Sequence, residues 1–315
     1  MKLKLTYALL ALLTAVSFTS CSEDDDNGTN QQPIYYFQAK ATTNFVYVKD
    51  LAAGTTATYP GSEQLIVFDM NTNTCSIAFS GLKYTTGDAM PFTIANVPLR
   101  SYSDPNVMGA EYSDPLTTTG SAANLSITNF KISVLLDPNR TFGVDDDGNK
   151  MLAGPQAFIS FVIGGRYDVT VVQNKQYFYG TTSSVNPSGN FAPFISQAPK
   201  YEVALNYTTG KAQLTIENAK FLEGMPDGIT MEFPGIDFTM TDNGLTLSGT
   251  DITPRIPKRG EMPAYKASTI SGTVTFGNRL DLSFTCPTVP IPMTGTTTYS
   301  FTVTVNAPYS LTGGL

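Results

Sequence analysis

The sequence predicts an all-β protein made of two related antiparallel β-barrel or β-sandwich halves in tandem. Charged residues are only 14% of the chain, against roughly 25% in an average soluble domain. Beyond residue 34, short β-branched or aromatic runs alternate with Gly, Pro, Asn and Asp, which is the pattern of strands and turns. No amphipathic helical window of useful length appears. Parallel strands need long crossover connections, so the sheets should be mostly antiparallel.

An internal repeat predicts the division into halves. Four pairs of segments match in the same order along the chain. They are Tyr36-Phe37 with Tyr177-Phe178, Val67–Thr74 with Ala204–Lys211, Asn124–Ile127 with Gly244–Leu247, and Gly164–Val171 with Gly277–Phe284. We therefore expect a first β-domain at 34–174 and a second, its repeat, at 175–315. The strand Tyr177–Ser183 could end the first half or begin the second, and the repeat leaves open whether the halves share a sheet.

The segment 1–20 has the build of an export signal. Lys2 and Lys4 precede an apolar stretch from Leu5 to Val16, which is too short to span a bilayer. Phe18-Thr19-Ser20-Cys21 resembles the lipobox of bacterial lipoproteins, and this resemblance implies cleavage before Cys21 and lipidation of that cysteine. An ordinary secretory signal beside an unrelated cysteine is the alternative.

An acidic, flexible tether should occupy 21–33. Its Ser22-Glu23-Asp24-Asp25-Asp26 run resembles the export signal of Bacteroidota surface lipoproteins, although a solvated linker would also be acidic. From Cys21 onward the plan resembles the calycin-like and related duplicated β-domain lipoproteins of that phylum, whose functions are uncharacterised. The resemblance implies an outer-membrane, lipid-anchored location, with the protein exposed at the cell surface.

Composition excludes several classes of function. The chain contains no His, which removes Ser-His and Cys-His nucleophilic pairs and His-ligated zinc. Its net charge of −7 becomes −9 once Lys2 and Lys4 are removed with the leader, and no basic cluster is present, so nucleic-acid binding is not expected. The sequence predicts no catalytic residue, no metal site and no cofactor.

The polar candidates each have a plainer structural explanation. Arg166/Asp168 and Arg279/Asp281 lie two residues apart, on one face of a strand, and could be ligand clamps or charged pairs beside turns. The loop 145–149 (Asp-Asp-Asp-Gly-Asn) could ligate Ca²⁺ but lacks EF-hand spacing. Glycosidase carboxylates would have to come from residues that read as scattered loop acids: Glu223, Asp227, Glu232 and Asp237.

Core packing is also the favoured explanation for two aromatic trios and for two cysteines. Tyr35-Tyr36-Phe37 and Tyr177-Phe178-Tyr179 could stack on sugars, yet strand alternation sends one ring of each trio to the opposite face. Cys75 and Cys286 do not occupy equivalent repeat positions, so two buried free thiols are favoured over a disulfide.

Three functions remain. The first is a non-enzymatic surface lipoprotein that is structural or binds a glycan, a small apolar ligand, a lipid or a protein. The second is a fimbrial or adhesin subunit, in which Thr298–Val305 would be exchanged between subunits or would close the second half. The third is a glycan hydrolase that uses two carboxylates.

Overall fold

The computed structural model describes residues 34–101, 107–120, 124–135, 143–144, 150–151, 156–196, 200–225, 228–242, 244–276, 279–290 and 297–308. The leader, Cys21, the tether, the 145–149 loop and Asp227 lie outside these residues. The chain divides into two compact units, one up to Gln173 and one from Asn174. Each is built from strands and is described by itself; helix within the described residues is confined to two 3-10 turns, Ala41–Thr43 and Pro263–Tyr265.

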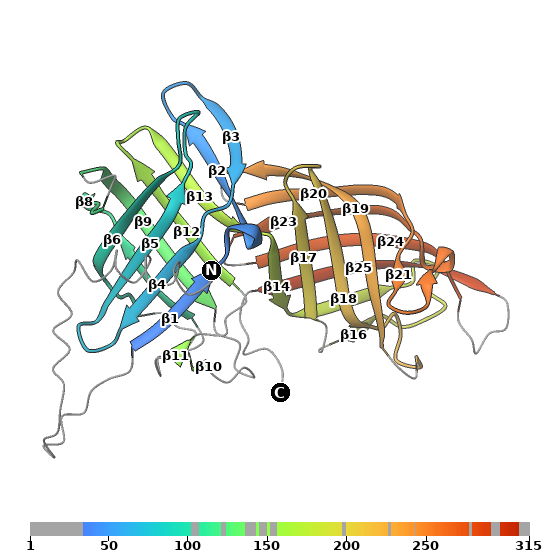
Figure 1. Cartoon of the computed structure of the whole chain (residues 1–315). Helices are drawn as coiled ribbons and strands as arrows, with labels where there is room; N and C mark the ends of the chain where they lie inside the picture. Colours follow the sequence, from blue (N-terminus) through green and yellow to red (C-terminus); the bar gives the residue numbers. More distant parts are fainter. Residues whose placement is uncertain are drawn as a thin grey trace, which may run out of the picture. The chain divides into compact units, whose positions relative to one another are not determined.

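The described residues of the first unit form two sheets, whose inner faces enclose an apolar core (Figure 1). One sheet has the order β10-β11-β1-β4-β5-β6, and the other has the order β3-β2-β13-β12-β9-β7 with β8 beside β9. The strands of the first sheet are β1 (Ile34–Ala39), β4 (Gln64–Asp69), β5 (Thr74–Leu82), β6 (Met90–Pro98), β10 (Gly143–Val144) and β11 (Lys150–Met151). Those of the second are β2 (Asn44–Asp50), β3 (Thr55–Pro60), β7 (Val107–Tyr112), β8 (Leu116–Thr117), β9 (Ser126–Leu135), β12 (Gln156–Ile163) and β13 (Tyr167–Gln173).

Large rings fill the core of this unit. Phe161 lies with its ring centroid 5.8 Å from that of Phe79, 6.3 Å from that of Phe92 and 6.4 Å from that of Phe130. All four are essentially inaccessible to solvent. Because these phenylalanines come from both sheets, burying them holds the two sheets together.

The described residues of the second unit form a single sheet, in the order β14-β17-β18-β19-β20-β23-β24-β25-β15-β16, with β21 beside β19 and β22 beside β21. Its strands are β14 (Lys175–Tyr179), β15 (Thr181–Val185), β16 (Phe194–Ser196), β17 (Lys200–Asn206), β18 (Lys211–Ala219), β19 (Ile229–Thr241), β20 (Gly244–Ile252), β21 (Arg255–Ile256), β22 (Gly260–Glu261), β23 (Ala267–Thr275), β24 (Arg279–Pro290) and β25 (Thr298–Pro308). The predicted all-β class with antiparallel halves is confirmed. One departure is the parallel pairing of β1 with β11.

The sheet of the second unit closes on itself at Gly180. This residue separates β14 from β15, so one run of chain pairs with β17 through β14 and with β25 through β15. A Cβ atom at Gly180 would lie 2.4 Å from the Cα of Ala307 and 2.4 Å from the carbonyl oxygen of Asn306. Glycine is therefore needed where the first and last strands of the sheet meet.

The first unit follows the same strand order. Its opening strand is also split, because β1 pairs with β4, while β2, beyond the 3-10 turn, pairs with β13. Between β1 and β2 the neighbouring strands follow in the order β4, β5, β6, β7, β9, β12, β13. The corresponding order between β14 and β15 in the second unit is β17, β18, β19, β20, β23, β24, β25. Between β6 and β7 no continuous ladder is formed among the described residues: Leu99, just after β6, bridges to Ala110 of β7, and Thr93 of β6 bridges to Thr119, just after β8. The two units thus share one order of strands.

The later sequence matches are out of step with this order by one strand. Asn124–Ile127 leads into β9 but matches the start of β20, which corresponds to β7. Gly164–Val171 leads into β13 but matches the start of β24, which corresponds to β12. The earlier matches, on β1 with β14 and on the β4–β5 hairpin with the β17–β18 hairpin, fall on corresponding strands.

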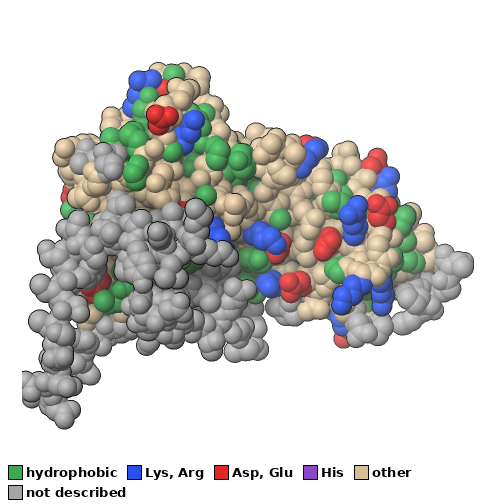
Figure 2. All heavy atoms as spheres, viewed as in Figure 1, with side chains coloured by type: hydrophobic (Ala, Val, Ile, Leu, Met, Phe, Trp, Pro, Cys, Tyr) green, Lys and Arg blue, Asp and Glu red, His purple; other side chains and the backbone are tan. Residues whose placement is uncertain are grey.

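Cations and anions alternate across the outer face of the second unit (Figure 2). Cross-strand pairs join Lys175 to Glu202 at 2.9 Å, Lys200 to Glu217 at 3.4 Å and Lys211 to Asp237 at 2.6 Å. Such exposed pairs contribute little to stability. None of the helical segments among the described residues has the length and apolar content that a membrane crossing requires.

We predict that Gly180→Ala destabilises the second unit by about 1–3 kcal/mol, since backbone atoms of β25 cannot move aside without breaking the closing ladder. Chemical denaturation of the full chain measures the change. Gly81→Ala on β5 is the matched control, because the nearest atom to its new Cβ, in Ala89, lies 3.6 Å away. Equal stability of the two variants would contradict the closing role of Gly180.

Candidate functional site

A cleft of about 320 Å³ lies at one end of the first unit, beside the β2–β3 hairpin. We call it the tyrosine cleft. Its wall comes from β2, β3, the segment between β5 and β6, and the turn into β13. The lining residues are Val48, Asp50, Thr55, Thr56, Ala57, Tyr59, Tyr84, Thr85, Thr86, Arg166 and Tyr167.

Strand register explains why these side chains gather there. Tyr167 of β13, Asp50 of β2 and Thr55 of β3 are directly opposite one another across three strands. Two residues further along, the same row is Val169, Val48 and Ala57. Side chains two residues apart share a face, so the cleft continues the core-facing side of this sheet. Val169 is fully buried, while Thr55 and Ala57 are exposed, so the cleft begins where the packed core ends.

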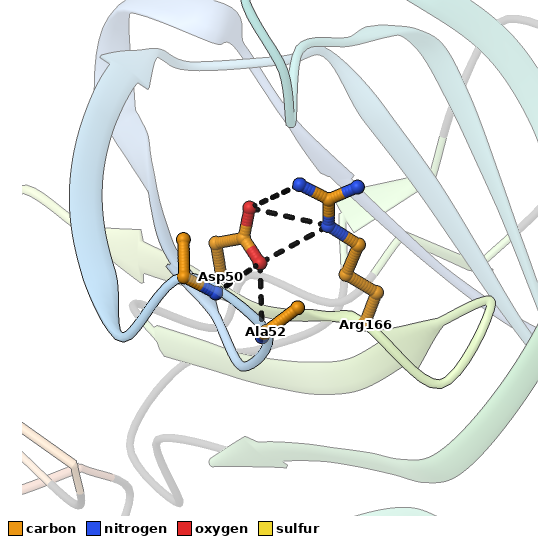
Figure 3. A network of polar contacts seen from close by, with 4 residues as sticks. Asp50, Ala52 and Arg166 are labelled. Carbon is orange, nitrogen blue, oxygen red and sulfur yellow. Dashed lines mark hydrogen bonds and ion pairs between the residues drawn. The ribbon is translucent and has the colours of Figure 1, made fainter.

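Asp50 forms the turn of the hairpin and also holds Arg166. Its Oδ1 atom accepts hydrogen bonds from the backbone N–H groups of Ala52 at 3.0 Å and Ala53 at 3.1 Å. Gly54 ends the turn with a φ of +67°. The guanidinium of Arg166 donates from Nε to Oδ1 at 3.1 Å and from Nη2 to Oδ2 at 2.7 Å, as Figure 3 shows. This two-point contact fixes the plane of the guanidinium at the edge of the cleft.

Three tyrosines supply the apolar part of the wall. The ring of Tyr84 meets that of Tyr167 edge-on, with 5.5 Å between centroids. The guanidinium carbon of Arg166 lies 4.9 Å from the centroid of Tyr167, and Nζ of Lys83 lies 5.8 Å from that of Tyr59. Four threonines also line the cleft and carry hydroxyl groups: Thr55, Thr56, Thr85 and Thr86. Flat rings beside hydroxyls and a fixed guanidinium can stack on a ring and hydrogen-bond its substituents.

Ionisation in the cleft is set by two effects. Hydrogen bonds from Arg166 lower the pKa of Asp50 to about 2, with further lowering from the Ala53 and Ala52 amides. Burial raises the pKa of Tyr84, and the nearby Tyr167 adds to this. At neutral pH Asp50 is therefore a carboxylate, and the phenol of Tyr84 is neutral.

The predicted Arg–Asp pairs have different outcomes. Arg279 contacts Asp281 at 2.7 Å, as expected for a pair on one strand face. Arg166 instead contacts Asp50, while Asp168 lies in β13 opposite Lys49. Sequence reasoning missed Asp50, although Asp50 to Gly54 repeats the pattern of Asn206 to Gly210, whose turn has the same hydrogen bonds to Asn206 Oδ1 and the same positive φ.

Other predicted candidates are dispersed or buried. Phe37 and Phe178 are buried, whereas Tyr36 packs on the other side of its sheet against Leu65, Val67 and Ala78. The prediction that Glu232 and Asp237 lie in a loop is wrong, because both lie within β19. Glu223 is exposed in the turn after β18. Within the described residues, no three acidic or cysteine side chains are grouped as metal ligands.

Both described cysteines are free and buried, as expected. Burial raises the pKa of the Cys75 thiol and raises that of Cys286 to about 12, so both remain protonated thiols at neutral pH. Neither lines the tyrosine cleft. A second hollow, of about 260 Å³, lies beside the β17–β18 turn, and its lining includes Leu205, Asn206, Lys211 and Gln213.

No family model matches the chain, and no curated protein matches it. Among solved structures, one match is the isotype 1 transferrin binding protein B from serogroup B Neisseria meningitidis. The identity is 11%, the alignment covers 88% of this chain and 78% of that one, and the TM-score is 0.23. A TM-score of this size is not evidence of a shared function.

We predict that the Asp50–Arg166 ion pair persists down to about pH 4 and is lost as the pH falls through about 2. A carboxyl group with a lowered pKa stays charged above its ordinary value of 3.8 and is protonated only below it, near 2. Carbon NMR of labelled aspartate measures the titration. In Arg166→Ala the midpoint should rise toward 3.8; an unchanged midpoint would mean that Arg166 does not lower the pKa of Asp50.

Proposed function

We propose that this chain is a non-enzymatic binding protein of the bacterial cell surface, which holds a glycan in the tyrosine cleft. Acyl chains on Cys21 would retain it at the outer membrane, with 21–33 as a flexible tether. Each buried CH₂ adds about 0.8 kcal/mol, so multiple chains hold a soluble body firmly. The observation that carries the binding function is the joining of three tyrosine rings, four threonine hydroxyls and a fixed guanidinium in one cleft.

A sugar matches this lining better than a purely apolar ligand does. Sugar rings present an apolar face that stacks on tyrosine, and their hydroxyls need hydrogen-bond partners at the rim. The exposed Thr55 and Thr56 can supply such partners, as can Arg166. An apolar ligand would leave these groups without partners, which costs free energy.

The cleft is poorly suited to glycan hydrolysis. A glycosidase needs two carboxyl groups, one of which must stay protonated to act as the acid. Asp50 is the single acid among the described lining residues, and hydrogen bonds from Arg166 hold its pKa at about 2. Its charge and its lone pairs are committed to the turn and to Arg166.

Strand exchange, as in a fimbrial subunit, would be costly at the C-terminal strand. β25 pairs with β24 on one side and with β15 on the other. Removing it would break two hydrogen-bonded ladders and open the sheet at Gly180. The pairing therefore favours a closing strand over an exchangeable one.

We predict that Tyr167→Ala weakens glycan binding about tenfold, or about 1.4 kcal/mol, through loss of stacking area. A glycan array identifies ligands, and titration calorimetry on the full chain in detergent measures affinity. Tyr177→Ala is the matched control, because Tyr177 also carries a cation over its ring, Lys200 at 5.2 Å, but lies in the second unit. The proposal fails if no glycan binds, or if the two variants lose affinity equally.

We predict that a clickable fatty-acid analogue labels the native chain in bacteria and that Cys21→Ala abolishes the labelling, because the thioether and the new amino terminus both depend on that cysteine. Gel fluorescence reads the result. Cys75→Ala is the control, since Cys75 is buried in the first unit and should leave labelling unchanged. Equal labelling of Cys21→Ala and the native chain would rule out the anchor.

A further inference from the structure

We propose that the glycan bound by the tyrosine cleft is acidic and that its carboxylate binds the outer edge of the Arg166 guanidinium. This inference rests on the proposed glycan-binding function and specifies the ligand class. It predicts a preference for uronic-acid units over neutral sugars.

The first support is the donor inventory of Arg166. A guanidinium has five N–H donors, arranged as a side fork of Nε and Nη2 and an end fork of Nη1 and Nη2. Asp50 takes the side fork, through Nε and Nη2. In Figure 3 the remaining terminal nitrogen points away from Asp50, with no contact drawn to it. The end fork has the geometry that binds a planar carboxylate through two parallel hydrogen bonds.

The second support is that Asp50 is fully used. Its Oδ1 accepts from Ala52, Ala53 and Nε of Arg166, and its Oδ2 accepts from Arg166. It therefore has little capacity for a ligand hydroxyl. We assign Asp50 as a positioning residue, which orients the end fork of Arg166 while completing the hairpin turn.

The third support is the local charge. The described lining residues contain one acid, Asp50, and one base, Arg166. Lys83, whose Nζ lies over the ring of Tyr59, adds a second cation beside the cleft. Asp88 lies on the same segment but is exposed and does not line the cleft. Lys83 does not line the cleft either, so the described lining is neutral within a chain of net charge −7 and does not repel an anionic ligand.

The tyrosines are compatible with an anion. Tyr84 lines the cleft, and a phenol can donate a hydrogen bond to a carboxylate or a hydroxyl. The ring of Tyr167 and the guanidinium are close, so a sugar ring stacked on the tyrosines would bring a carboxylate on its rim near Arg166.

The test compares oligogalacturonates and glucuronate-containing oligosaccharides with their methyl esters, by titration calorimetry on the full chain in detergent. Esterification removes the charge and keeps the sugar. We expect the free acids to bind at least about tenfold more tightly, as charge-assisted hydrogen bonds to arginine imply, and to weaken as salt rises. Arg166→Ala should remove the difference. Arg166→Lys should remove most of it, because an ammonium has no fork.

Arg279→Ala is the matched control. It removes an exposed arginine from an Arg–Asp pair of the second unit, and it should leave the preference intact. Equal affinity for acids and esters would overturn the inference while leaving glycan binding in place, and so would tight binding of neutral sugars alone. If sulfated oligosaccharides that contain no uronic acid bound as tightly as uronates, the carboxylate assignment would be overturned. Absence of binding to every glycan would overturn the proposed function itself.

Discussion

The architecture of both units depends on an opening run of chain that pairs with the next strand of its unit and also with the last one. A sheet without such a run would leave two long edges whose backbone groups could pair with other chains. In the second unit Gly180 allows the change of partner, because β25 passes too close for any side chain. In the first unit the change is made at the 3-10 turn. There Asn44 donates to the carbonyls of Lys40 and Ser62 and accepts from the amide of Ser62. Gly61 is also required, because its Cβ would lie 2.1 Å from the carbonyl oxygen of Asn44.

The fold class was predictable because it depends on local chemistry. Turn residues and two-residue alternation identify strands without knowledge of their partners. The order of the strands was harder to predict. Alternating strands resemble one another, so a comparison of short blocks could slip by one strand, as it did at β9 and β13. The parallel pairing of β11 with β1 left no local signal either, because the partner of a two-residue strand depends on the folded sheet.

The tyrosine cleft was harder still to predict from the sequence. Its residues come from four separated segments, and the register of β3, β2 and β13 brings Thr55, Asp50 and Tyr167 into one row. Sequence spacing suggested Asp168 as the partner of Arg166, since both were expected on one strand face. The turn after β2 instead presents Asp50 to the guanidinium. Tyr84 and the threonines beside it had no distinguishing pattern, and their role emerges only from their position beyond the end of the packed core.

The turn that holds Asp50 has a consequence for how the charge of the tyrosine cleft can evolve. Asn206 forms the same turn in the second unit with an amide in place of a carboxylate, and Thr208 and Thr209 donate to it as Ala52 and Ala53 donate to Asp50. The backbone therefore accepts either side chain. A single-nucleotide change from aspartate to asparagine would alter the charge at the mouth of the first unit without rebuilding its hairpin. The charge beside Arg166 is in this sense separable from folding, and a lineage can change it with little risk to the scaffold.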